Sequence, residues 1–358
     1  MPGTHDDISA STFATLTAQG QMRRLRPLAV AALEHYGMHG ADLRLLRHAE
    51  NTTYRIDVEP GHLPPLPEGP YIPNRFLLRL HGPGYQTAAT LHSESLWLQT
   101  LRQDAELPVP EPVVTREGQF CVAIRVPGVP SPRFCRLLRW MTGRHRYRNL
   151  SPPQVRQLGR LMARMHLHAQ HWKPPAGFQR RCWDGEGLFR TTGGFGIPAK
   201  VAWQSIPEPY YRPLRQVADE LAKTMQTLGN GSEVFGLIHA DLGLSNVLFS
   251  GGEARAIDFD DCGFGYWIYD VAVTLRRWRW RPEWPVYRQA FVTGYHEVLP
   301  LPVGLWCYLN IFMAGRNVLI ALWAAGKASS HTHLRRDLPA RLKTAVDFIA
   351  QYKQIQSS

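Results

Sequence analysis

Lysine is missing from almost half of the chain, because the first lysine among the 358 residues is Lys173. The chain is nevertheless strongly basic, with 41 Lys and Arg residues against 29 Asp and Glu residues and a formal net charge of +12. A permanently charged cation in the first part of the chain must therefore be an arginine. The arginine clusters are short and dispersed, and no known nucleic-acid-binding motif accompanies them. We therefore expect no nucleic-acid partner.

Paired cysteines, a secretory signal and an uninterrupted membrane span are also missing. The five cysteines are odd in number and never stand at CxxC spacing, so neither a disulfide framework nor a cysteine metal site is indicated. No charged start precedes an apolar run and a cleavage site, which makes the cytoplasm the expected location. The longest apolar stretch, Leu305 to Gly326, contains Asn310 and Arg316. It predicts a buried helix and no membrane partner, while the oligomeric state is left open.

The hydrophobic period changes along the chain and predicts two lobes. Residues 1–22 have no sustained period, so we expect a flexible N-terminal segment without a chemical role, either a mobile tail or a loosely attached helix. Residues 23–135 predict a small, mostly antiparallel β lobe with one main helix. Within it we expect a first helix ending near Gly37, strands at 43–49, 52–58 and 75–80, the main helix at 88–102, and a hairpin formed by 112–115 and 120–126.

The second lobe, residues 136–358, predicts mainly helices, beginning with one over 152–171. Residues 173–232 are rich in proline, glycine and aromatic residues and show a helical pattern only from about residue 213. We interpret this segment as a family-specific insertion rather than core. The fold class is therefore α+β, with a larger helical lobe after the small sheet.

A polar loop between two apolar runs carries the candidate chemistry. Asp241 and Asn246 lie in this loop, between Val234–Ile238 and Val247–Phe249. A turn sequence then leads into a second strand that ends just before Asp258, so the two strands predict a hairpin. Its open end would bring Asn246 and Asp258 together. Magnesium prefers oxygen ligands and usually takes one or two from the protein, so these two residues are candidate metal ligands.

The same loop offers a base for phosphoryl transfer. That reaction requires the protein to hold a metal–nucleotide complex, to place an acceptor hydroxyl in line and to take up its proton. Asp241 is the natural proton acceptor. We expect His239 to pack and hydrogen-bond within the loop rather than to touch the substrate.

Several spaced motifs follow one another in this part of the chain: His239-Ala240-Asp241, Asn246, Ile257-Asp258-Phe259-Asp260-Asp261, Gly263, Gly265 and Tyr269-Asp270-Val271-Ala272. With these motifs the segment resembles the aminoglycoside phosphotransferase and choline kinase group, which includes homoserine kinases and is related to the protein-kinase fold. The resemblance covers residues 25 to about 350 loosely, and only Leu237 to Leu275 sharply. It implies a bilobal protein-kinase-like fold, ATP and Mg²⁺ as cofactors, Asp241 as catalytic base, Asn246 and Asp258 as magnesium ligands, and Asp270 as a structural anchor of the catalytic loop. Because Asp270 stands where an apolar helix should begin, we also expect it to be the N-cap.

In the first lobe the resemblance extends to the nucleotide. Asn51, Thr52 and Thr53 resemble the strand turn that lies over the nucleotide phosphates. The strand lysine of kinases is missing, and Arg79 is its expected substitute, since a guanidinium can grip phosphate oxygens with two hydrogen bonds. Glu94 on the following helix would orient Arg79, although a solvent-facing surface pair is the alternative. Leu138 and Trp140 fall in a stretch that resembles the hinge whose backbone holds adenine.

The sequence says least about the compound that would accept the phosphate. Asp260 and Asp261 are candidate substrate-binding or metal-tuning residues, and a hydrogen-bonded loop role is equally open. Trp267 and Arg316 are further candidate substrate-binding residues. Trp267 could wall an acceptor pocket or belong to the core, and Arg316 could reach a carboxylate near the acceptor or form a structural salt bridge.

Three functions fit this sequence. The first is an ATP-dependent phosphotransferase that acts on a hydroxyl of a small molecule, such as an amino alcohol, an amino acid, a sugar or an aminoglycoside-like compound. The second is a protein serine/threonine kinase, and the third is a catalytically inactive nucleotide-binding regulator. The intact set of Asp241, Asn246 and Asp258 argues against the third.

Overall fold

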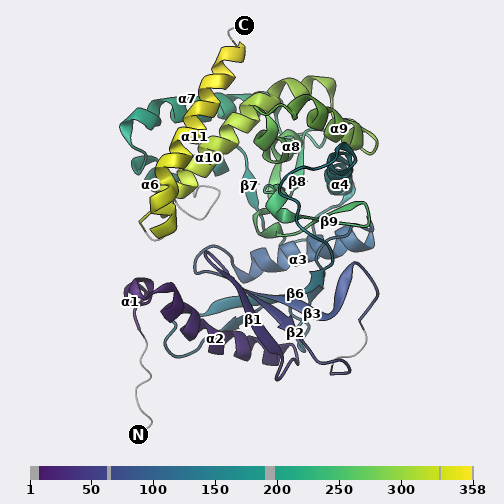
Figure 1. Cartoon of the computed structure of the whole chain (residues 1–358), viewed down its shortest axis with the longest axis vertical. Coiled ribbons are helices and arrows are strands. Elements are labelled where there is room, and N and C mark those ends of the chain that lie inside the picture. The colour runs from purple at the N-terminus through teal and green to yellow at the C-terminus, as the bar shows by residue number, and fades with distance from the viewer. Residues whose placement is uncertain (1–7, 63–65, 190–197, 330–331, 357–358) are drawn as a thin grey trace. The chain divides into compact units, whose positions relative to one another are not determined.

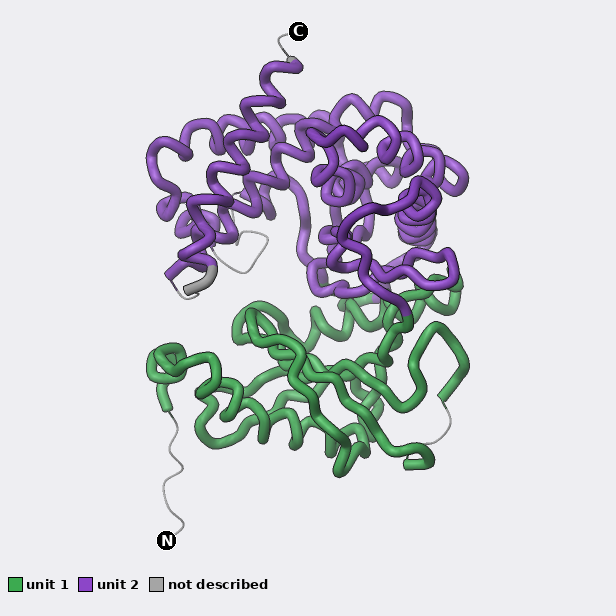
Figure 2. Tube along the Cα trace, viewed as in Figure 1, with its two compact units in different colours: residues 1–142, 176–179 green, residues 143–175, 180–358 purple. Residues whose placement is uncertain are grey.

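The computed structural model describes residues 8–62, 66–189, 198–329 and 332–356. The chain forms two compact units, which Figure 2 distinguishes by colour. The first comprises residues 1–142 with 176–179, and the second comprises residues 143–175 and 180–358. The last strand of the first unit runs to Met141, whereas the sequence analysis places the boundary after residue 135.

The first unit is built on an antiparallel six-stranded sheet (Figure 1). The predicted hairpin over residues 112–126 is wrong, because its two strands do not pair with each other. Both pair with one long strand, at residues 137–138 and 133–135 respectively, and that strand can accommodate two short partners along one edge. The sheet order is β1 (Asp42–His48), β2 (Thr52–Asp57), β3 (Tyr71–Leu80), β6 (Arg133–Met141) and β4 (Pro112–Val113), and β5 (Val122–Ile124) also pairs with β6.

One face of this sheet forms the core with α2 (Ala18–His35). Alternate strand residues such as Ile56 and Leu78 are fully buried there against the apolar stripe of α2. The short helix α1 (Ala10–Thr15) adds Phe13 to the same core. Residues 8–22 are therefore largely helical and anchored by an apolar side chain, which agrees with the expected attached helix rather than with a mobile tail. Residues 1–7 of the expected segment lie outside the described residues.

The helix α3 (Ala88–Gln103) follows the third strand, as predicted for residues 88–102. A reciprocal capping box between Thr87 and Thr90 begins it. Residues 176–179 belong to this unit as well, and the backbone N–H of Gln179 donates to the Ser93 hydroxyl at 2.8 Å. Several polar residues of α3 are buried, among them Glu94 with no exposed surface.

The second unit is mainly helical (Figure 1). Its helices α4 (Pro152–His171) and α9 (Trp284–His296) cross at close range. A Cβ at Gly159 would lie 2.1 Å from the Phe291 carbonyl oxygen, and a Cβ at Gly294 would lie 2.0 Å from that of Arg156. Only glycine permits this backbone approach.

The apolar helix α10 (Leu309–Lys327) is the buried helix expected near residues 305–326. The stretch Val303–Lys327 is long and apolar enough to span a membrane, but most of it is buried inside the protein. It packs against α7 (Glu208–Leu228), α8 (Trp267–Leu275) and α11 (Thr332–Gln356). The interpretation as a core helix is confirmed.

Residues 173–232 contribute to the core, so the expectation that they lie outside it is wrong. Within them β7 (Arg181–Trp183) pairs in parallel with β11 (Gly263–Tyr266), which in turn pairs with β8 (Phe235–Ile238). Trp183 and Leu214 have no exposed surface. A parallel pairing across some 80 residues leaves no local pattern to detect. The segment also holds α5 (Gly185–Phe189) and α6 (Ala199–Gln204), while its residues 190–197 lie outside the described residues.

Candidate active site

A tight backbone turn after β8 carries the candidate catalytic loop. Ala240 has a φ of 65°, in a left-handed region that residues with a side chain rarely adopt. The Asp270 carboxylate accepts the backbone N–H of His239 at 3.0 Å and that of Ala240 at 2.8 Å. The expectation that Asp270 is a helix N-cap is wrong: α8 begins at Trp267 with Tyr266 as N-cap. Its carboxylate holds the amides of the loop instead of those of its own helix.

A buried histidine holds Asp270 from the other side. His166 Nε2 lies 3.2 Å from Asp270 Oδ2, and His166 Nδ1 lies 2.6 Å from the Tyr295 hydroxyl. Burial lowers the pKa of His166, against the opposing effect of Asp270. A neutral ring then donates from Nε2 to Asp270 and accepts the tyrosine O–H at Nδ1. The catalytic loop is thereby tied to α4 and α9, a link that the sequence did not reveal because it joins three distant segments.

The His239 ring is turned into the loop. It has no exposed surface, its Nδ1 accepts the Asp241 N–H at 3.3 Å, and its Nε2 lies 3.1 Å from the Ile257 carbonyl oxygen. A ring that accepts at Nδ1 must donate from Nε2, so these two contacts are compatible with one neutral tautomer. His239 therefore joins the loop to the end of the hairpin.

The predicted hairpin is confirmed, and it brings two oxygen-bearing side chains to one end. The strands β9 (Val247–Ser250) and β10 (Glu253–Ala256) are paired, and beyond them the Ile257 N–H donates to the Asn246 carbonyl oxygen at 2.9 Å. Asn246 precedes the first strand, and Asp258 follows at the same end with a φ of 66°. Asn246 Nδ2 donates to both the carbonyl oxygen and Oδ2 of Asp241, each at 2.9 Å. The amide oxygen of Asn246 is thus the atom that a cation could take.

These oxygens suit a hard divalent cation. An amide oxygen and a carboxylate provide the two protein ligands that Mg²⁺ commonly uses, with the remaining positions filled by phosphate and water. Within the described residues, no three His, Cys, Asp or Glu side chains are grouped as a metal site. The arrangement therefore fits a cation that arrives with a nucleotide better than one held by the protein alone.

Asp241 lies against a buried arginine from α10. Arg316 Nη2 donates to Asp241 Oδ1, and Arg316 Nη1 donates to the Tyr269 hydroxyl at 2.9 Å. Burial raises the pKa of Asp241 to about 6, against the opposing effect of the Arg316 guanidinium. Both carboxylate oxygens of Asp241 consequently have a donor, one from Arg316 and the other from Asn246.

Side chains of other segments bond the backbone carbonyl oxygens of residues 260–262, which follow the hairpin. Arg180 donates to the carbonyl oxygens of Asp260 and Cys262, each at 2.6 Å. Trp183 Nε1 donates to the carbonyl oxygen of Asp261 at 2.8 Å. The carboxylate of Asp260 is buried, whereas Asp261 is half-buried. Arg180 was not expected to take part in the site, since it comes from the segment interpreted as an insertion.

In the first unit, the turn between β1 and β2 is held by polar contacts. Asn51 Oδ1 accepts the Gly82 N–H at 3.2 Å, and the Thr52 hydroxyl lies 2.8 Å from His48 Nδ1. Thr52 is buried and Thr53 is half-buried. A Cβ at Gly82 would lie 2.3 Å from the Glu50 carbonyl oxygen, so this turn and the end of β3 are in close contact.

Arg79 lies on the central strand β3, opposite Arg136 on β6. Cross-strand partners share one face of a sheet, so the two guanidinium groups project to the same side. Glu94 of α3 pairs with Arg136 at 2.5 Å, and both side chains are fully buried. From the sequence we expect Glu94 to be a partner of Arg79. The contact with Arg136 is not evident from the sequence, because the place of Arg136 beside Arg79 depends on strand register. Like charges directly opposite each other are unfavourable, which accounts for a carboxylate on this face.

The stretch compared with an adenine-binding hinge belongs to β6. Leu138 is buried, with Leu77 of β3 on one side and Pro112 of β4 on the other. Trp140 near the end of the strand is half-buried. Thr142, just after the end of β6, donates both its N–H and its hydroxyl to the Pro70 carbonyl oxygen.

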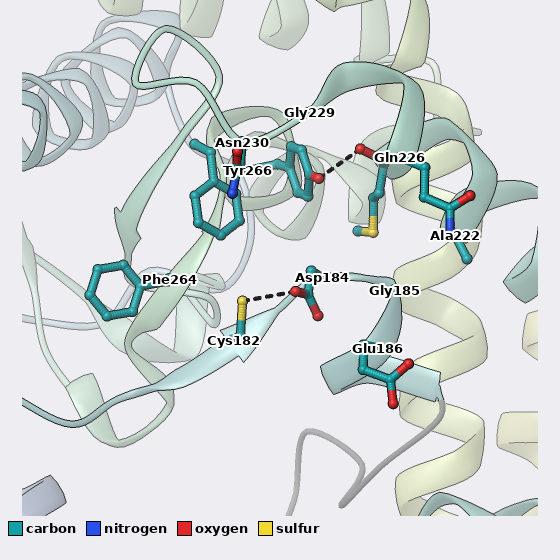
Figure 3. A pocket seen from close by; sticks show the side chains of 12 residues that line it. Cys182, Asp184, Gly185, Glu186, Ala222, Gln226, Gly229, Asn230, Phe264 and Tyr266 are labelled. Atoms are coloured by element: carbon teal, nitrogen blue, oxygen red, sulfur yellow. Dashed lines mark hydrogen bonds between the residues drawn. The ribbon is translucent and has the colours of Figure 1, made fainter.

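A cavity of about 450 Å³ lies at the other end of the second unit's three-stranded sheet (Figure 3). Its lining includes Asp184, Phe235 and Tyr266, where β7 and β11 end and β8 begins. The catalytic loop follows the opposite end of β8, about 13 Å away along the strand. Trp267 is fully buried, and its ring centroid lies 4.6 Å from that of His166.

The matches to known proteins point to one family. The family model described as "Phosphotransferase enzyme family" matches residues 42–306. The amicoumacin kinase of Bacillus subtilis (strain 168) is 28% identical over 175 residues, which cover 46% of this chain and 48% of that protein. The homoserine kinase of Janthinobacterium sp. (strain Marseille) is 28% identical over 227 residues, which cover 57% and 60%. The chain spans about half to three fifths of these curated relatives.

Solved structures match over nearly the whole chain. A microcompartment-associated aminopropanol kinase is 30% identical with a TM-score of 0.74, covering 92% of this chain and 97% of that one. The amicoumacin kinase hAmiN, solved in complex with AMP-PNP, Ca²⁺ and Ami, is 21% identical with a TM-score of 0.72, covering 95% and 96%. The protein-kinase-like fold and the resemblance to aminoglycoside phosphotransferases are confirmed. The chain belongs to the phosphotransferase enzyme family.

Proposed function

We propose that the protein transfers the γ-phosphate of ATP to a hydroxyl group of a small molecule. The observation that carries this proposal is the hairpin of residues 247–256, which brings Asn246 and Asp258 to one end while Asn246 also bonds Asp241. Phosphoryl transfer needs oxygen ligands for a divalent cation beside a carboxylate base. These three residues meet that need, and family membership supports the same reaction.

Asp241 is the proposed base. In this role it accepts the proton of the acceptor hydroxyl as that oxygen attacks the γ-phosphorus, and ADP leaves. Asn246 and Asp258 would hold Mg²⁺, which neutralises charge on the phosphate oxygens when it is bound. Asp270 and His239 would keep the loop in place through the backbone and ring contacts described above.

The first unit supplies the proposed nucleotide contacts. Arg79 would bind phosphate oxygens with its guanidinium, and the turn formed by Asn51, Thr52 and Thr53 would lie against the phosphates. Glu94 would help to orient the arginines on that face of the sheet, through its contact with Arg136. The backbone around Leu138 and Trp140 would hold the adenine. AMP-PNP and Ca²⁺ in the structure of hAmiN support ATP and a divalent cation as partners of this fold.

The proposed acceptor is a small hydroxyl compound, and amino alcohols and hydroxy amino acids are the first to test. An aminopropanol kinase and a homoserine kinase are among the relatives. Asp260 and Asp261 lie two and three residues after the proposed metal ligand Asp258, so they could favour an acceptor that carries an amine. The cytoplasm, where ATP and Mg²⁺ are available, is the proposed location.

The test is a screen for acceptor-dependent ADP release. The purified protein is given ATP, Mg²⁺ and, one at a time, aminopropanol, homoserine, spectinomycin and a sugar. At least one compound should raise ADP release, and its phosphorylated form should appear by mass spectrometry. Asp241→Ala should abolish that release with a modest effect on ATP affinity, whereas Asp219→Ala, in an exposed pair with Arg215 on α7, should behave as wild type.

The screen also distinguishes the second candidate function. If added protein substrates become labelled with radioactive phosphate and no small hydroxyl compound raises ADP release, the protein is a protein kinase and the proposal is wrong. Binding of ATP without any transfer would favour the inactive regulator.

A further inference from the structure

Arg316 lies in the middle of the core helix α10 and reaches the catalytic loop. The residue is 4% exposed in a helix most of whose residues are buried. An unpaired charge at such a position is costly, and here two donors of the guanidinium are used on Asp241 and Tyr269. The contact with Asp241 therefore offsets the cost of burying the Arg316 charge. A purely structural role, however, does not require the partner to be the proposed base.

The exposure of the two partners differs sharply. The Asp241 side chain keeps 36% of its surface exposed, whereas that of Arg316 keeps 5%. A substrate can therefore touch Asp241, while Arg316 lies on the protein side of the carboxylate. This difference argues against direct contact between Arg316 and an acceptor, which the sequence analysis left open.

The contacts of Asp241 fix the direction in which its carboxylate points. Arg316 bonds Oδ1, and Asn246 bonds Oδ2 at 2.9 Å. Rotation of the carboxylate would break both bonds. Each oxygen still has a second lone pair, so one of them can accept the proton of a hydroxyl group.

Arg316 is itself held in place by a tyrosine. Its Nη1 donates to the Tyr269 hydroxyl at 2.9 Å, and the ring of Tyr269 stacks on Trp183 with centroids 5.9 Å apart and an interplanar angle of 20°. Both aromatic rings are fully buried. A rigid series of contacts therefore runs from the core to the carboxylate.

We propose that Arg316, held by Tyr269, is a positioning residue that orients Asp241 for proton uptake and makes no contact with the acceptor. The role rests on the proposed function, since it assigns to Arg316 an effect on the base of that reaction. A misplaced catalytic group can cost about 100-fold in rate, so loss of this support should reduce turnover rather than substrate binding.

The test separates turnover from binding. With ATP and aminopropanol as substrates, Arg316→Ala should lower kcat by about 100-fold and leave KM for both substrates within about threefold. Guanidinium ion added to the buffer should restore part of the kcat of Arg316→Ala, and Arg316→Lys should retain more activity than Arg316→Ala. Tyr269→Phe, which removes one hydroxyl, should lower kcat by less than Arg316→Ala.

The matched control is Arg279→Ala, because Arg279 also bonds a residue of α10, Asn310, at 2.9 Å. The kcat of Arg279→Ala should not respond to guanidinium.

Two results would overturn the assignment. One is a rise in KM for aminopropanol with little change in kcat, which would make Arg316 a substrate-binding residue. The other is a kcat that neither guanidinium nor Arg316→Lys improves, in variants that unfold at the wild-type temperature.

A second measurement does not depend on any acceptor. The melting temperatures of Arg316→Met, Asp241→Asn and the double variant are compared in the absence of nucleotide. Coupled partners should give a double variant that loses less than the sum of the two single losses. Additive losses would contradict the Arg316–Asp241 contact even if the acceptor screen succeeds, while coupling without activity on any acceptor would leave the contact supported and contradict only the proposed function.

Discussion

The charged residues of the two units are assembled in different ways. In the second unit Asp241, Asn246 and Asp258 lie within 18 residues, and one hairpin brings them to the same end. In the first unit Arg79, Glu94 and Arg136 come from β3, α3 and β6. A local hairpin has few alternative arrangements, whereas the partner of Glu94 depends on which strands are neighbours and in what register. A site formed by residues close together in the sequence can therefore be predicted from the sequence, whereas the partners of residues that meet across a sheet cannot.

The two sets also differ in what their charges do. The pair of Glu94 and Arg136 has almost no exposed surface, with both groups below 2%. Asp241 is paired with a buried arginine but stays accessible. We expect the first pair to affect stability more than activity and the second set to affect activity more than stability.

The largest expected effect comes from the variant of Asp258, the proposed metal ligand at the end of the hairpin. Asp258→Ala should lower phosphate transfer by about 10³-fold, close to 4 kcal/mol, because it removes a carboxylate that would hold the charge-neutralising cation. ATP affinity should also lose its dependence on Mg²⁺. Both are measured by titrating Mg²⁺ in assays of turnover and of nucleotide binding. Unchanged Mg²⁺ dependence would show that Asp258 is not a ligand.

Removal of one partner of the buried pair should be the next largest effect. Arg136→Met removes the guanidinium that contacts the buried Glu94 carboxylate at 2.5 Å, so the free energy of unfolding should fall by about 3 kcal/mol or more. Denaturant titration measures the loss. The double variant Glu94→Met/Arg136→Met should recover most of it, and Arg75→Met, which breaks a partly exposed pair with Asp57, should cost less than about 1 kcal/mol. A loss as small as that of Arg75→Met would contradict the pairing.

A third variant affects both stability and activity in the second unit. Asp270→Asn replaces one of the two oxygens that accept the His239 and Ala240 N–H groups by an amide nitrogen. One buried N–H should then lose its partner, at a cost of about 2 kcal/mol in unfolding free energy. Because the same loop carries Asp241, kcat should fall as well. If stability falls and kcat does not, Asp270 supports the fold without placing the base.

The smallest expected effect is on ATP binding by the first unit. Arg79→Ala should weaken ATP binding about tenfold, or about 1.4 kcal/mol, because it removes a charge-assisted contact to phosphate. Isothermal titration with ATP and Mg²⁺ measures this change. Arg75→Ala on the same strand is the matched control. ATP affinity that is unchanged in Arg79→Ala would mean that another cation holds the phosphates.

Periodic and local features were predictable. The helix over residues 152–171 was predicted with its observed bounds, because its apolar positions recur at helical spacing and a proline begins it. The hairpin before Asp258 followed from two apolar strands around a glycine turn. The short strands β4 and β5 were misassigned to one hairpin, since their turn is real but their hydrogen bonds go to β6.

The sequence by itself determined the fold class, the hairpin that carries the candidate site and the family, because each depends on short segments whose residues contact near neighbours. Only the tertiary structure decided that Arg316 meets Asp241, that Arg136 meets Glu94, and that β7 joins the sheet of β8 and β11. These contacts join residues dozens of positions apart. A buried charge must find some partner, but which partner it finds depends on how helices and strands pack.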